Sequence, residues 1–338
     1  VRGADAASAN FAADFLHSNQ FHKGKVNTMS TWRKVGCCLI AAVAAFVARA
    51  EAPNTQWTWT KLNSTTVTLT EVTPEGYDPE TYVPWKFNLT SAGVLSIATT
   101  VDTTGLTSPK INFRTIPEDC PYEIKSLAGR YFMAKSTSYS STQSTAAATI
   151  IEEVYLPASL TTFNMYNFYE CAKLKICDLP PDNQVATIAD HAFRGCASLQ
   201  EYCLGPNVTT INGSANNGAF NGCSHLVFTG LMVPDTLTTI QNQAFRGASS
   251  TLLSGRVVFG GDDSHDVSFG SYAFCSQPSI TELVFGAKVT NCGTSKGSAT
   301  TPFAYCTSVT NFVSRNPDGF TFGSTTDSYL FNLNGLKQ

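Results

Sequence analysis

The chain has 338 residues, and its 22 Lys and Arg against 25 Asp and Glu give a formal net charge of −3 at pH 7. Charged residues make up only 14% of the chain, against about 25% in an average soluble domain, which excludes a nucleic-acid binder that relies on a basic face. The hydrophobic fraction of 43% excludes disorder over most of the length, and 11 cysteines are too sparse here for a disulfide-rich miniprotein.

The first fifty residues are typical of a targeting sequence. Met29 opens a short positive region, which is followed by a 13-residue apolar run and by Ala-Arg-Ala ending at position 50. This order predicts a secretory signal peptide over 29–50, because a membrane-spanning helix needs about 20 apolar residues. We interpret residues 1–28 as an upstream extension foreign to the mature protein, and we expect no membrane span in the mature chain.

Residues 51–135 have the pattern of a small β-rich region. Apolar and polar residues alternate with a period of two, as they do in strands. The expected strands lie at 57–59, 66–70, 85–89 and 95–101. Because a repeat array needs a cap over its exposed end, we expect an N-terminal cap or domain here. The Ser- and Thr-rich stretch 136–149 is then a polar linker or a long loop.

From about residue 150 onward the chain repeats. One frame occurs at 191–199 as HAFRGCASL and again at 218–226 as GAFNGCSHL, with weaker copies on both sides. The anchoring phenylalanines, spaced 25, 27, 25, 29 and 29 residues apart, are Phe168, Phe193, Phe220, Phe245, Phe274 and Phe303. Each frame is followed by a β-like run and then by a step such as VTTI at 208–211. One such unit cannot bury its own apolar side, whereas stacked units form a continuous core.

This pattern resembles the BspA-type leucine-rich repeat, whose hallmark is an Ala-Phe-x-x-Cys-x-x-Leu core with an apolar-Pro step and a Val/Leu-Thr-x-Ile step. The resemblance covers about residues 150–315, with a degenerate copy to 335. It departs from the pattern at Ala248, which replaces the Cys, and at Cys275, which is shifted. The resemblance implies a β-rich solenoid of leucine-rich-repeat type, with a parallel sheet and short helical turns, in an exported or surface-displayed adhesion or binding protein.

Within a solenoid over 150–335 we expect one short strand per coil, all stacked in one parallel sheet. The strands are expected at 154–156, 177–179, 202–204, 231–233, 257–259 and 283–285.

Few residues point to chemistry. One repeat position holds Cys171, Cys196, Cys223 and Cys306, which favours buried thiols in a core column because Cys behaves as a small hydrophobe. The acidic segment 262–266 lacks the ligand spacing of a calcium loop and is expected to be a solvated loop. The sequence contains no Gly-x-Ser-x-Gly, His-Glu-x-x-His or phosphate-loop motif. We therefore expect no enzyme, no metal site and no cofactor.

Four glycosylation sequons begin at Asn63, Asn88, Asn207 and Asn212. They matter if the host is eukaryotic, and some matches are expected by chance in a chain rich in Ser and Thr.

Two functions remain. The first is a secreted or cell-surface protein that binds a host or matrix protein, or a carbohydrate. The second is an accessory repeat module of an extracellular hydrolase, whose catalytic part would fall within 53–135 or in a domain further downstream.

The binding face is expected where strand residues point away from the core, between two core positions. These outward columns are apolar and are edged by acidic residues, and a long exposed apolar ribbon usually binds something. The partner-binding residues expected from the columns are Tyr155, Glu201, Met232, Val258, Glu282 and Val284. Ordinary β-propensity for Val and Tyr, or cover by the N-terminal β region, would also account for the ribbon.

Overall fold

The computed structural model describes residues 54–98, 106, 108–129, 132–133, 143–202, 204–214, 218–228, 233–248, 252–290 and 302–319. All of them belong to one compact unit, Cys37–Gln338. The extension and signal peptide expected over 1–50 lie outside the described residues. Within the described part, no helix has both the length and the apolar character that a membrane crossing requires.

The N-terminal strands form an antiparallel meander. It consists of β1 (Trp57–Asn63), β2 (Thr66–Glu71), β3 (Lys86–Thr90) and β4 (Val94–Ile97). Buried residues alternate with half-buried ones along β2, β3 and β4, because one face of the meander packs on the core. The four strands overlap the four segments in which the sequence predicted strands.

Six of the described coils carry two strands, so the expectation of one strand per coil is wrong. The first strands of the coils form a five-stranded sheet and a three-stranded sheet, both parallel. The five-stranded sheet contains β5 (Lys110–Asn112), β7 (Glu153–Tyr155), β9 (Ile176–Asp178), β11 (Glu201–Tyr202) and β13 (Val227–Phe228). The three-stranded sheet contains β15 (Gly255–Phe259), β17 (Ile280–Phe285) and β18 (Asn311–Ser314).

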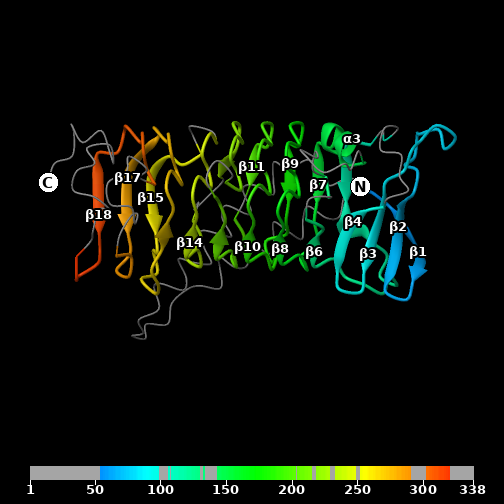
Figure 1. The fold of residues 1–338 in the computed structure, drawn as a ribbon, viewed down its shortest axis with the longest axis horizontal. Helices are drawn as coiled ribbons and strands as arrows, with labels where there is room; N and C mark the ends of the chain where they lie inside the picture. The colour runs from blue at the N-terminus through cyan, green and yellow to red at the C-terminus, as the bar shows by residue number, and fades with distance from the viewer. Residues whose placement is uncertain are drawn as a thin grey trace, which may run out of the picture. The chain divides into compact units, whose positions relative to one another are not determined.

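The apolar steps that follow each β-like run, such as VTTI at 208–211, supply the second strand of these six coils. These strands are β6 (Ser126–Leu127), β8 (Thr162–Phe163), β10 (Thr187–Ile188), β12 (Thr210–Ile211), β14 (Thr239–Ile240) and β16 (Ser268–Phe269). They pair in parallel, and β6 also pairs with β4, so the ladder continues the meander into a ten-stranded sheet (Figure 1). Two extended pieces per coil can each align with the same piece of the next coil, which is why both become strands.

Five of the six expected first strands overlap β7, β9, β11, β15 and β17. The strand expected at 231–233 lies largely outside the described residues; the first strand described in this coil is β13, where Val227 pairs with Glu201 and Phe228 with Tyr202. The strand position follows the preceding phenylalanine turn, whereas the expectation counted back from Pro234. The ladders also begin earlier than residue 150, since β5 and β6 precede it.

Two short helices complete the described elements. The 3-10 helix η2 (Phe113–Thr115) follows β5, and α3 (Gln143–Ile150) occupies part of the stretch expected to be a linker. The alanine run at 146–148 explains α3, since Ala has the highest helix propensity.

A column of stacked phenylalanine rings runs through the coils. Between Phe168 and Phe303, successive ring centroids lie 5.1–5.5 Å apart and successive ring planes differ by 2–12°. Phe132 extends the column, with centroids 5.5 Å from Phe168 and 5.8 Å from Phe87 of the meander. The meander and the coils therefore share one hydrophobic core.

Each phenylalanine turn is closed two positions later by a residue with positive φ. In order, these residues are Glu170, Gly195, Gly222, Gly247, Ser276 and Tyr305, with φ between 55° and 80°. A left-handed residue ends a helical turn, and Gly takes that conformation at the lowest cost. Glycine occupies this position in three of the six phenylalanine turns.

Candidate binding face

The repeated cysteines are core residues. Cys171, Cys196, Cys223 and Cys306 are buried free thiols. Three of them donate to the carbonyl of the anchoring phenylalanine one coil earlier, with Sγ···O distances of 3.0 Å for Cys196, 3.1 Å for Cys223 and 3.4 Å for Cys306. Burial raises the pKa of each thiol well above its ordinary value, to about 12 in Cys306. The prediction of buried thiols is confirmed, and these groups are structural.

The fifth coil has Gln277 at the thiol position, three residues after Phe274. Gln277 is fully buried, and its Oε1 accepts a hydrogen bond from the Leu253 amide at 3.3 Å. The sequence suggested a shifted Cys275 here. In the structure Cys275 is buried but lies outside the core cluster, with its Sγ 3.5 Å from Ser276 Oγ.

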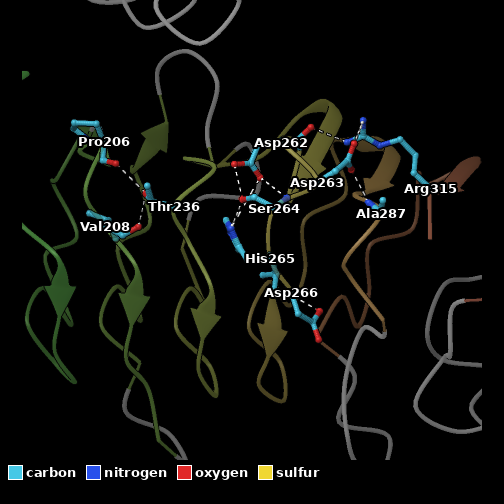
Figure 2. Close-up of polar contacts among 12 residues, drawn as sticks. Pro206, Val208, Thr236, Asp262, Asp263, Ser264, His265, Asp266, Ala287 and Arg315 are labelled. Atoms are coloured by element: carbon cyan, nitrogen blue, oxygen red, sulfur yellow. Dashed lines mark hydrogen bonds and ion pairs between the residues drawn. The ribbon is translucent and has the colours of Figure 1, made fainter. Parts of the chain in front are cut away.

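The acidic segment 262–266 uses its carboxylates to hold the next coils (Figure 2). Asp263 Oδ1 accepts from the Ala287 amide at 2.6 Å, and its Oδ2 lies 3.2 Å from Arg315 Nη1. Asp266 accepts from the amide and the hydroxyl of Thr290 at 3.2 and 3.0 Å. Among the described residues, no group of three or more His, Cys, Asp and Glu side chains is arranged to hold a metal ion.

Over β5, β7 and β9, the outward face of the five-stranded sheet is covered by charged side chains. Arg114 of η2 donates from Nη2 to Asp178 at 2.9 Å and from Nε to the Leu156 carbonyl at 2.9 Å. Its guanidinium carbon lies 5.7 Å from the Tyr155 ring centroid. The Tyr155 hydroxyl donates to Glu153, which also pairs with Lys110 at 2.7 Å. Tyr155 lies outside the core cluster, yet this cover leaves it only 3% exposed.

The outward face of the three-stranded sheet is more open. Its residues stand in two rows across β15, β17 and β18: Arg256, Glu282 and Asn311 in one row, Val258, Val284 and Val313 in the other. We call these six residues the C-terminal strip. Arg256 Nε lies 3.2 Å from Glu282 Oε2, and Asn311 Nδ2 donates to Glu282 Oε1 at 3.0 Å. Val313 is 36% exposed, whereas Val284, between its two neighbours, is 2% exposed.

The six residues expected to bind a partner therefore do not form one surface among the described residues. Val258, Glu282 and Val284 come together in the strip. Tyr155 lies in the other sheet and is covered, and Val284 is 2% exposed between its neighbours, so the expectation that these two side chains are exposed is wrong. Glu201 is placed in β11 by its backbone only, and Met232 lies outside the described residues.

Sequence reasoning missed the covering role of Arg114. Its partner Asp178 is 64 residues away along the chain, so neither spacing nor motif links the two. An alternating strand with Asp at an outward position was the one local signal, because a carboxylate that is buried needs a cationic partner.

The family model described as a BspA type leucine rich repeat region matches this chain in six copies, over residues 114–253 and 214–321. Among solved structures, a leucine rich repeat protein of T. pallidum is similar at 15% identity and a TM-score of 0.38, over 75% of this chain and 90% of that one. A leucine rich cell surface protein of Faecalibacterium prausnitzii A2-165 is similar at 15% identity and a TM-score of 0.37, over 76% of this chain and 78% of that one. No curated protein matches by sequence. Because the matched copies together span residues 114–321, more than half of the length, the chain belongs to the BspA-type leucine-rich repeat family.

Proposed function

We propose that this chain is an exported, non-catalytic repeat protein, secreted or held at the cell surface, that binds a protein or a glycan through the C-terminal strip. The observation that carries the proposal is the register of β15, β17 and β18, which sets an apolar row directly beside a charged and polar row.

The strip has the composition of a small interface. Partner-binding surfaces combine an apolar centre with a polar rim, and here Val258 and Val313 supply accessible apolar surface and the Arg256–Glu282–Asn311 row supplies the polar rim. In the Arg256–Glu282 pair the Arg256 side chain is 61% exposed and the Glu282 side chain 24%, and an ion pair near the surface contributes little to folding. Its charges therefore remain available to orient a partner.

Rigidity favours binding on this face. The strip residues are fixed on paired strands, whose backbones need no ordering when a partner arrives, so less conformational entropy is lost on binding. The family supports the same role, since leucine-rich repeats bind proteins in general.

The test is a binding array of matrix proteins and glycans probed with the exported protein, followed by variants of the strip. The double variant V258S/V313S and the single variant R256A should each weaken binding about tenfold or more, the loss expected from about 1.4 kcal/mol at a central contact. Thr210→Ser on β12, in the other ladder, is the matched control and should bind as the unchanged protein does.

Full binding by both strip variants would refute the strip as the site. Retention of the protein inside the cell would refute export, and hydrolysis of the bound partner by the exported protein would refute the non-catalytic role.

A further inference from the structure

The four sequons occupy different places in the fold. Asn88 is half-buried on β3, between β2 and β4, and its Oδ1 accepts from Thr68 at 3.0 Å. Asn207 is exposed, but its Nδ2 donates to the Asn183 carbonyl of the preceding coil at 2.9 Å. Asn212 is half-buried and is followed by Gly213, where an added Cβ would collide with the Asn242 carbonyl. At each of these three positions the side chain or the adjacent backbone takes part in contacts between strands or coils.

Asn63 differs because it stands at an open hairpin tip. The turn between β1 and β2 consists of Ser64 and Thr65, and every residue from 60 to 65 is exposed. Asn63 Oδ1 accepts from the Thr65 amide at 2.9 Å and from the Thr65 hydroxyl at 3.2 Å. In a planar carboxamide the oxygen and the nitrogen point to opposite sides of Cγ. Since the oxygen faces into the turn, Nδ2 faces away from it, and it has no hydrogen-bond partner among the described residues.

The same hairpin ends the ten-stranded sheet. Among the described strands β1 pairs with β2 only, so its other side is a sheet edge with no strand partner in this part of the chain. The apolar side chain of Leu62, next to Asn63, is 57% exposed. Exposed sheet edges pair readily with other chains, and proteins usually protect them. A large hydrophilic group at residue 63 would stand beside this edge and hinder such pairing.

We propose that Asn63 is N-glycosylated and that its glycan shields the β1 edge. The modification rests on the export proposed above. The co-reactant is a polyprenyl-diphosphate-linked oligosaccharide supplied to a membrane-bound transferase. The Nδ2–C1 bond forms as the C1–O bond to the diphosphate breaks. One Nδ2 proton passes to a base of the transferase, and the polyprenyl diphosphate leaves.

The test is peptide mapping by mass spectrometry of protein collected from the medium of the source organism. Treatment with peptide-N-glycosidase in heavy-oxygen water converts a glycosylated Asn into a labelled Asp, so we expect the label at residue 63. The variants N63Q and T65A should lose the glycan, T65S should keep it, and N207Q should leave the glycan at residue 63 unchanged. An unlabelled Asn63 in exported protein would overturn the modification while leaving export intact. Protein retained in the cell would overturn export itself.

Shielding is tested on the same samples by light scattering after size-exclusion chromatography. The unglycosylated N63Q variant, which keeps a neutral side chain at the edge, should associate as its concentration rises, and the glycosylated protein should stay monomeric. Two identical monomeric profiles would overturn the shielding role. Replacing exposed Leu62 with Lys should suppress the association, because an edge charge opposes strand pairing.

Discussion

The meander β1–β4 and the ladder β6–β16 belong to one sheet, but different interactions hold them together. In the meander, β1 and β2 share six residue pairs and β2 and β3 share five. In the coils, β10 and β12 share two. Ladders this short contribute few hydrogen bonds per coil, but other backbone hydrogen bonds join successive coils at the phenylalanine turns, as from the Phe193 amide to the Ala219 carbonyl at 2.8 Å and from the Gly195 amide to the Asn221 carbonyl at 2.8 Å. The comparison shows that long strand ladders hold the meander, whereas dispersed backbone hydrogen bonds and a stacked phenylalanine column hold the coils.

The largest expected effect is that of Phe220→Ala, in the middle of the column. Phe220 is fully buried and stacks on both Phe193 and Phe245, so its loss should lower the free energy of unfolding by about 3–5 kcal/mol. Denaturant unfolding followed by far-UV circular dichroism measures this change. Phe220→Leu, which keeps more apolar volume, is the matched control and should cost less.

Tryptophan fluorescence sharpens the same experiment, because Trp57, Trp59 and Trp85 all lie in or beside the meander. If different interactions hold the two regions, the Phe220→Ala variant should show two separate transitions. The circular dichroism signal of the coils should be lost at a lower denaturant concentration than the tryptophan fluorescence of the meander. Coincident transitions in this variant would show that the meander and the coils unfold as one unit, against the comparison.

A second variant expected to destabilise the coils is Gly218→Ala, in the turn before Phe220. A Cβ on Gly218 would collide with the carbonyl of Gln243 in the next coil, so neighbouring coils would have to separate locally. We expect a loss of about 1–3 kcal/mol, the usual cost of overpacking. Gly76→Ala, in the meander, is the control: it has φ of +89° but open space around it, so its cost comes from backbone conformation alone. Equal thermal shifts in both variants would argue against tight coil stacking.

The thiol column should respond more weakly. Cys223→Ala removes a buried sulfur and its contact with the Phe193 carbonyl, and we expect a loss of about 1 kcal/mol. Ala248 already occupies the same position in the next coil, so the fold tolerates the smaller side chain. Chemical denaturation compares this variant with Phe220→Ala. A loss as large as that of the phenylalanine would assign the column's stabilisation to the thiols.

The smallest effect concerns Glu71, at the end of β2. Burial raises the pKa of this carboxyl, although its hydrogen bonds from the Trp85 amide and the Tyr82 hydroxyl oppose the rise. The folded chain then binds the proton more tightly than the unfolded chain, so stability falls as pH rises from the unfolded pKa to the folded one. Glu71→Gln keeps an acceptor oxygen and should remove this part of the pH dependence. Thermal unfolding over acidic to neutral pH measures it, and an unchanged profile would contradict the assignment.

The repeat and its core could be predicted because the same residues recur at the same positions. Phe193 and Phe220 identify the turns, and Ile188 and Ile211 identify the inward side of the second extended piece. Their pairing into a second ladder could not be predicted, since two residues are too few for a strand pattern. The position of β13 was missed because more residues of sequence separate it from Pro234 than separate β11 from Pro206.

The candidate site was less predictable than the fold. Alternation along β15 and β17 placed Val258 and Val284 side by side, as the register confirms. Alternation alone carries no information about which side chains from other coils lie over a strand. The cover of Tyr155 by Arg114 is a long-range contact of this kind, and only the folded chain shows it.

The spacing of the phenylalanine column has a mechanical consequence. Each coil is 25–29 residues of chain, contacts chiefly its neighbours, and is held by one ring on either side. Under a pulling force, such coils should detach singly from an end, each releasing about 80–105 Å of contour length. A surface tether built this way would lengthen in steps and dissipate load, with the antiparallel meander as the part that yields last.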